Sequence, residues 1–155
     1  MKRLVIKVGT AVLTQDGQLA LERMDNLVNL ISKLKNEKNL QVILVSSGAV
    51  GAGFTSLKLD KKIVANKQAL AAIGQPLLLK HYKKRFKQHN IVCAQMLFIA
   101  DDFDSRKRSK NAQNVMEILL DNNILPIINE NDVIATEELV FGDNDQLAAH
   151  VAYYF

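Results

Sequence analysis

The sequence predicts an α/β fold, in which helices cover both faces of a mainly parallel β-sheet to give three layers. Short apolar segments alternate along the chain with longer segments whose apolar residues recur at helical spacing. Apart from Gln41, residues 40–45 are apolar throughout, which is typical of a strand buried on both faces of a parallel sheet. The 155 residues fit one domain, and 48% hydrophobic with 23% charged residues is ordinary for a globular protein.

The first half of the chain begins with a strand at residues 3–8, which ends at Gly9-Thr10. Residues 20–36 are expected to form an amphipathic helix, and residues 40–45 the second strand. The apolar face of that helix carries Met24, Leu27, Val28, Ile31 and Leu34. From Ser46 onward, the chain enters a glycine-rich helix start.

In the second half, residues 61–89 are expected to form one or two helices, with a break at Gly74-Gln75-Pro76. A third strand follows at 91–98 and a fourth at 125–128. Between them, Asp104 or Ser105 is expected to cap a helix that runs to about Asn122. Its inward residues would be Val115, Ile118 and Leu119. A closing helix covers 143–154.

Composition limits the function classes. Cys93, the single cysteine, lies in an apolar run and is expected to be a buried small hydrophobe, and no histidine–cysteine cluster suggests a zinc site. No run of about 18 apolar residues and no signal h-region occur, so we expect a cytoplasmic protein without a membrane partner.

The net charge of +4 comes largely from one basic segment. Its cations are Lys80, Lys83, Lys84, Arg85 and Lys87. Tyr82 and Phe86 are four residues apart within it, so on a helix they share one face and are expected to point into the core. A solvated helix face is therefore favoured over a nucleic-acid site.

Lys7, Gly9 and Thr10 stand at the end of the first strand, where open α/β sheets bind ligands. Phosphoryl transfer depends on positioning and charge neutralisation, so an ammonium group aimed at a migrating phosphoryl group would serve it. Gly9 would let the backbone approach phosphate oxygens. The alternative, that Lys7 extends into solvent from an edge strand and Gly9 only makes a turn, is equally open.

Ser47 and Gly48 join the second strand to the glycine-rich helix, whose N-terminus can bind carboxylate or phosphate. The glycines at 48, 51 and 53 do not match the phosphate-binding loop that ends in Gly-Lys-Ser/Thr. A plain serine N-cap, with glycines for helix packing, is the alternative.

Two polar clusters, residues 129–132 and 142–145, lie beside apolar segments. Burying such groups unpaired costs roughly 1–3 kcal/mol each, so their place at strand ends favours a small polar ligand. Asn129, Asp132, Asn144 and Asp145 supply acceptors suited to an α-ammonium group. The alternative is a solvated hairpin around Glu137, Glu138 and Gly142. With the lysine turn, the clusters suggest a kinase acting on an amino acid, whose ionised carboxylate would need no general base.

Motifs along essentially the whole chain resemble, in order, those of the glutamate 5-kinase family, within the amino acid kinase superfamily. They are Lys-Val-Gly-Thr at 7–10, Val-Ser-Ser-Gly-Ala at 45–49, Lys-Gln-Ala-Leu-Ala-Ala-Ile-Gly-Gln at 67–75, Leu-Leu-Asp-Asn-Asn-Ile at 119–124, Ile-Asn-Glu-Asn-Asp at 128–132 and Gly-Asp-Asn-Asp at 142–145. The resemblance implies a three-layer αβα sandwich and transfer of the ATP γ-phosphoryl group to the side-chain carboxylate of L-glutamate. This reaction is the first step of proline synthesis.

The resemblance also implies roles and partners. Lys7 would contact the transferring phosphoryl group, with Gly9 and Thr10 near the phosphates. The glutamate ligands would be Ser47, with Gly48 beside it, Asp132 and Asn144, with Asn129 and Asp145 adjacent. Mg²⁺ would accompany ATP, proline would inhibit by feedback, and the protein would form a dimer or tetramer.

Family members continue beyond the position of Phe155 into the half that holds the nucleotide. Residues 1–155 are therefore expected to be the N-terminal, amino-acid-binding part of a longer enzyme. A non-catalytic glutamate- or proline-binding module, or a sister kinase with another acceptor, are the competing hypotheses.

Overall fold

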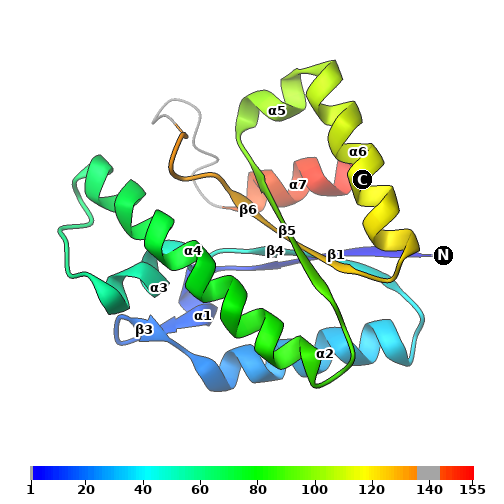
Figure 1. Cartoon of the computed structure of the whole chain (residues 1–155), viewed down its shortest axis with the longest axis horizontal. Coiled ribbons are helices and arrows are strands. Elements are labelled where there is room, and N and C mark those ends of the chain that lie inside the picture. Colours follow the sequence, from blue (N-terminus) through cyan, green and yellow to red (C-terminus); the bar gives the residue numbers. More distant parts are fainter. Residues whose placement is uncertain (1, 136–143) are drawn as a thin grey trace.

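The computed structural model describes residues 2–135 and 144–155 and is built on a four-stranded sheet (Figure 1). The spatial order of its strands is β1-β4-β6-β5, and all three neighbouring pairs are parallel. The strands are β1 (Arg3–Val8), β4 (Gln41–Ser46), β5 (Cys93–Phe98) and β6 (Leu125–Glu130). The parallel sheet predicted from the sequence is thereby confirmed.

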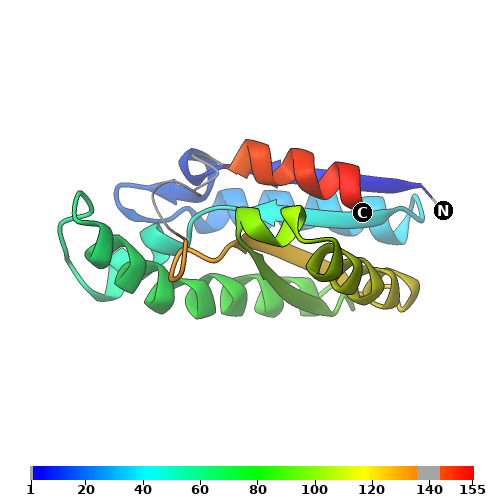
Figure 2. The ribbon, with the colours of Figure 1, turned by 90° about the horizontal axis from the view of Figure 1, so that it is seen from above.

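Helices lie on both sides of this sheet, so the three predicted layers are also confirmed (Figures 1 and 2). On one side are α2 (Leu21–Asn36), α3 (Ala49–Ser56) and α4 (Val64–Lys87). On the other are α5 (Ala100–Asp104), α6 (Arg106–Asp121) and α7 (Asn144–Tyr154). The turn α1 (Thr10–Leu13) and a small hairpin of β2 (Thr14–Gln15) and β3 (Gln18–Leu19) connect β1 to α2.

Strand β4 divides the core in two, because successive side chains of a strand point to opposite faces. Val42 and Leu44 pack in the cluster that contains the buried residues of α2 and α4. Ile43 and Val45 pack in the cluster formed with α6 and α7. Every residue of β4 is buried, which explains its nearly unbroken apolar sequence.

The break expected at Gly74-Gln75-Pro76 is wrong, because α4 continues through Pro76. A proline inside a helix costs roughly 3 kcal/mol. Here Ala71 and Leu78, on either side of it, are both buried against the rest of the fold. Tertiary packing of the two halves therefore outweighs the local cost.

The inward face of α6 also differs from the expected one. Val115 and Ile118 are 47% and 63% exposed, whereas Met116 and Leu120 are buried and Leu119 is half-buried. Two overlapping apolar stripes exist on this helix, and spacing alone does not choose between them. The Ser105 cap is confirmed, since its Oγ accepts a hydrogen bond from the Arg108 backbone N–H (3.4 Å).

The four lysines of the basic segment of α4 are exposed, as expected, whereas Arg85 is half-buried and pairs with Asp25 (2.6 Å). Tyr82 and Phe86 are fully buried, and the Tyr82 hydroxyl lies 2.8 Å from Ser46 Oγ. Cys93 is half-buried, and burial raises the pKa of its thiol to about 12, so it is protonated at neutral pH. Within the described ranges, no helix has the length and apolar character to cross a bilayer.

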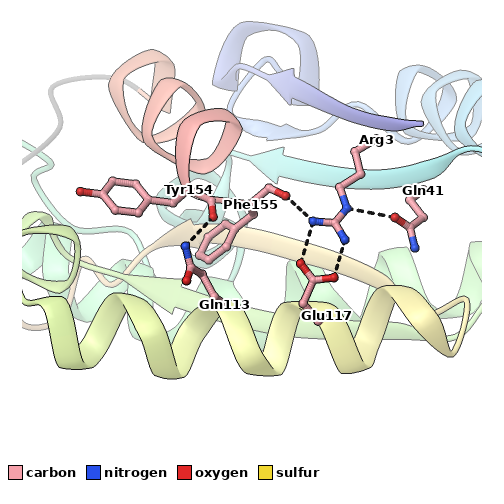
Figure 3. Close-up of polar contacts among 6 residues, drawn as sticks. All are labelled: Arg3, Gln41, Gln113, Glu117, Tyr154 and Phe155. Atoms are coloured by element: carbon pink, nitrogen blue, oxygen red, sulfur yellow. Dashed lines mark hydrogen bonds and ion pairs between the residues drawn. The ribbon is translucent and has the colours of Figure 1, made fainter. Parts of the chain in front are cut away.

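Both ends of α7 are held to strand β1. At its first turn, Lys7 Nζ lies 2.6 Å from Asp145 Oδ1. At its last turn, Arg3 Nη1 donates to the Phe155 carbonyl oxygen (2.6 Å), and the Arg3 guanidinium also pairs with the Glu117 carboxylate (Figure 3). A cation near a helix C-terminus is favourable because the last carbonyls carry partial negative charge. These contacts set the position of α7, whose first residues face the functional site described below.

Gly74→Ala is expected to destabilise the fold by about 1–3 kcal/mol, because a Cβ at this position would overlap the Ala49 carbonyl where α4 meets α3. Chemical denaturation measures the change. Gly9→Ala is the matched control, since its added Cβ would meet only Lys7 Nζ at 3.6 Å. Equal stability of the two variants would contradict the close contact of α3 and α4.

Glu117→Gln is expected to lower the free energy of unfolding at neutral pH by at most about 1 kcal/mol, since the pair with Arg3 is at the surface. The hydrogen bond from Arg3 lowers the pKa of Glu117. The stabilisation is therefore present above the ordinary glutamate pKa and lost as the pH falls through the lowered one. Urea denaturation at pH 7 and pH 3 tests this, with Glu37→Gln as an exposed control; a difference independent of pH would argue against it.

Candidate functional site

The carboxyl ends of β1, β4 and β6 surround a cavity of about 470 Å³. Most of the residues predicted from the sequence line it. They are Lys7, Gly9, Thr10, Ser47, Gly48, Asn129, Asp132 and Asn144. Strands that are distant in sequence end at one edge because they are parallel, so their loops converge as topology predicts.

Lys7 brings a positive charge to this cavity from the end of β1. Its side chain is 28% exposed and its ammonium pairs with Asp145 at 2.6 Å, so Lys7 does not simply extend into solvent. Gly9 has φ −83°, a backbone conformation open to any residue, so the turn itself does not require glycine. Its missing side chain instead leaves space beside the ammonium, because a Cβ there would lie 3.6 Å from Lys7 Nζ.

Ser47 and Gly48 form the connection between β4 and α3. The Ser47 backbone N–H donates to the Val8 carbonyl (3.0 Å), and its Oγ accepts a hydrogen bond from Asn144 Nδ2 (2.8 Å). The serine is therefore not the helix N-cap, which is Gly48 with φ +105°. A side chain at Gly48 would be strained in this left-handed conformation.

The other two glycines of α3 serve packing, as the alternative interpretation proposed. A Cβ at Gly53 would overlap the Leu70 carbonyl of α4, and one at Gly51 would crowd the Thr14 side chain. Glycine in this segment therefore has two separate purposes, a left-handed turn at residue 48 and close helix contact at residue 53.

Asn144 and Asn129 form the centre of a buried amide network. Asn144 Nδ2 donates to Asn129 Oδ1 (3.0 Å) as well as to Ser47, and Asn129 Nδ2 donates to Gln75 Oε1 (2.9 Å). Asn129 Oδ1 also accepts the Glu130 backbone N–H (2.9 Å). Asn129 and Asn144 are only 4% and 7% exposed, and their burial is tolerated because these groups have partners. The network joins the start of α7 to β4, β6 and α4.

Asp132 lies on the turn that follows β6. Burial raises the pKa of its carboxyl group, and the positive charge of Lys67 opposes that shift. The turn is anchored to α4, because Gln68 Nε2 donates to the Ala135 carbonyl (3.3 Å). A carboxylate that is partly desolvated gains most from a cationic ligand, since pairing offsets the cost of burial.

Asp145 differs from its expected place beside the other acceptors. Its side chain is 66% exposed, and it is absent from the described lining of the cavity. It is instead the partner of the Lys7 ammonium at the cavity's margin. Gly142, Asp143, and the hairpin considered around Glu137 and Glu138 lie outside the described residues.

Four polar side chains that line the cavity were missed in the sequence: Lys61, Lys67, Glu130 and Thr14. Two of them had a usable signal, because Lys67 opens the motif at 67–75 and Glu130 sits inside the cluster 129–132. Lys61 and Thr14 had no such signal in the sequence. Lys61 lies in a polar loop and Thr14 in the small hairpin, and neither is part of a motif. Over the residues that the structure covers, no group of three or more histidine, cysteine, aspartate or glutamate side chains could hold a metal ion.

Comparison with known proteins agrees with this architecture. The model of the amino acid kinase family matches residues 2–155. The chain is 55% identical over its full length to a glutamate 5-kinase of Wolinella succinogenes and covers 60% of that protein. It is 51% identical to one from Leishmania donovani, of which it covers 58%, and 48% identical to one from Thermus thermophilus, of which it covers 41%.

The chain therefore spans about four to six tenths of the length of the curated relatives it matches. The family match extends over nearly every residue that builds the sheet and its cavity. We conclude that the chain belongs to the amino acid kinase family.

Proposed function

We propose that residues 1–155 are the N-terminal, amino-acid-binding part of a glutamate 5-kinase. The enzyme would transfer the γ-phosphoryl group of ATP to the side-chain carboxylate of L-glutamate, giving L-glutamyl 5-phosphate for proline synthesis. The relatives named above support the substrate. The observation that carries the proposal is that the Lys7 ammonium and the partly desolvated Asp132 carboxylate line the same cavity.

Asp132 and Lys7 would act at opposite ends of L-glutamate, which accepts the phosphoryl group. Asp132 would bind the α-ammonium, and this pairing would relieve the burial of its carboxylate. Asn144 already donates both amide N–H groups, to Ser47 and Asn129, so its Oδ1 would accept a hydrogen bond from the same ammonium. The Ser47 hydroxyl, with Gly48 and Asn129 beside it, would donate to and orient the side-chain carboxylate. The network among these residues is already formed, so binding would require little rearrangement of them.

Lys7 would act on the transferring phosphoryl group. An oxygen of the ionised side-chain carboxylate forms the new bond to phosphorus as the bond to ADP breaks, so no proton has to be removed first. The ammonium would neutralise charge on the phosphoryl oxygens, with Gly9 and Thr10 bordering the phosphates. Removal of one such group typically costs about 2.7–4 kcal/mol of barrier. Asp145 would hold Lys7 in place through their ion pair.

Further elements complete the proposal. ATP would bring Mg²⁺ on its own phosphates. Proline would inhibit by competing for the ammonium- and carboxylate-binding end, since it shares these groups with glutamate and lacks the side-chain acid. The protein would act in the cytoplasm as a dimer or tetramer, without nucleic-acid or membrane partners.

Phosphoryl transfer tests the activity directly. In the complete gene product that contains these residues, ATP consumption is expected with L-glutamate and not with aspartate or acetylglutamate. Turnover with another acceptor in preference to glutamate would overturn the assignment of substrate.

Asp132→Asn is expected to stabilise the protein at pH 7. Burial raises the pKa of this aspartate in the folded state, so its ionisation costs stability. That cost is absent below the ordinary aspartate pKa and is fully present above the raised one. Thermal unfolding at pH 7 and pH 3 should show a gain at pH 7 that disappears in acid. A loss of stability at pH 7 would make Asp132 a structural residue.

The same variant is expected to bind L-glutamate about 10- to 100-fold more weakly, as for the loss of a hydrogen bond between charged groups. Isothermal titration calorimetry measures the affinity. Asp104→Asn, an exposed aspartate of α5, is the matched control and should bind as the unmodified protein does. Unchanged affinity in Asp132→Asn would remove Asp132 from the site.

A further inference from the structure

Lys67 lines the cavity and has been given no role above. It belongs to the first turns of α4, on the same face as Ala71 and Gln75, which follow at intervals of four residues. This face is turned toward the end of β6: Gln75 accepts a hydrogen bond from Asn129, and Ala71 is 3% exposed. The neighbouring Gln68 bonds to Ala135, so the start of α4 is tied to the turn that carries Asp132.

Three lysines line the cavity, and two of them already have partners. Lys7 pairs with Asp145. Lys61 Nζ lies 3.9 Å from the centre of the Phe54 ring, a cation–π contact. Lys67 takes part in none of the ion pairs found among the described residues, although its charge acts on Asp132. It is therefore the cavity lysine best placed to receive an anionic group.

The charged groups of an amino acid indicate which anionic group Lys67 would bind. An α-amino acid presents an ammonium and a carboxylate on one carbon atom, so the protein groups that bind them must be neighbours. Asp132 and Lys67 have opposite charges, come from segments joined by the Gln68 hydrogen bond, and line the same cavity, where the charge of Lys67 acts on Asp132. Lys7, by contrast, comes from β1 at a different strand end.

We propose that Lys67 binds the α-carboxylate of the amino-acid substrate, beside the α-ammonium on Asp132. The inference rests on the proposed function and adds a determinant of specificity to it. Lys67 distinguishes an α-amino acid from a molecule that has the same ammonium and side-chain acid without the α-carboxylate. With that end held, the side-chain acid is directed toward Lys7.

A cycle of two ligands and two proteins tests the assignment. L-isoglutamine keeps the ammonium and side-chain carboxylate of L-glutamate and replaces only the α-carboxylate with a neutral amide. NMR chemical-shift titration of the protein with each ligand measures affinities into the millimolar range. Lys67→Met should weaken glutamate binding about 10- to 100-fold and change isoglutamine binding less than about threefold.

Two further variants make the result specific. Lys67→Arg keeps the positive charge and should retain most of the glutamate affinity. Lys58→Met removes the same charge from an exposed residue whose Nζ lies 4.2 Å from the centre of the Phe54 ring, and this variant should bind both ligands as the unmodified protein does. Equal weakening of both ligands by Lys67→Met, or no weakening of either, would overturn the role of Lys67. Failure of the unmodified protein to bind glutamate would instead overturn the proposed function, and this inference with it.

Discussion

The hydrogen bonds of the Asn144 amide are the interaction on which the rest of the site depends. This side chain joins the first residue of α7 to Ser47 after β4 and to Asn129 near the end of β6. Because these three residues belong to separate elements, one buried amide fixes the relative positions of two strand ends and a helix. The Lys7–Asp145 pair then holds the same turn of α7 to β1, and the Arg3 contacts hold its other end. Ser47, Asn129 and Asn144 are therefore already held in their positions at the cavity before a ligand binds.

The charged groups that line the cavity differ in their environment. Lys7 has an acidic partner within the protein, so its position is maintained in the absence of ligand. Asp132 is partly desolvated, and its raised pKa reflects the cost of holding a carboxylate there. Under the proposed function, the substrate ammonium compensates that cost. The protein would thus accept a small loss of stability at the residue that recognises its substrate.

Packing between α3 and α4 determines the structural effect of their glycines and proline. Gly74 and Gly53 let α3 and α4 approach one another closely, and Pro76 stands two residues from Gly74 without ending the helix. The same pair of helices forms one wall of the cavity, through Ala49 and Lys67. Close contact between them therefore has a functional consequence, because it brings the Lys67 turn to the end of β6.

The sequence alone determined the alternation of strands and helices, since the apolar pattern of β4 and the spacing of Tyr82 and Phe86 report burial directly. It also determined that polar residues follow the strands, which was enough to predict about half of the residues that line the cavity. Tertiary structure decided which apolar stripe of α6 faces inward, that Pro76 is tolerated, that Asp145 partners Lys7, and that Lys67 faces the cavity. Each of these depends on contacts between segments far apart in the chain, and the strand order β1-β4-β6-β5 that creates those contacts is not encoded in any local spacing.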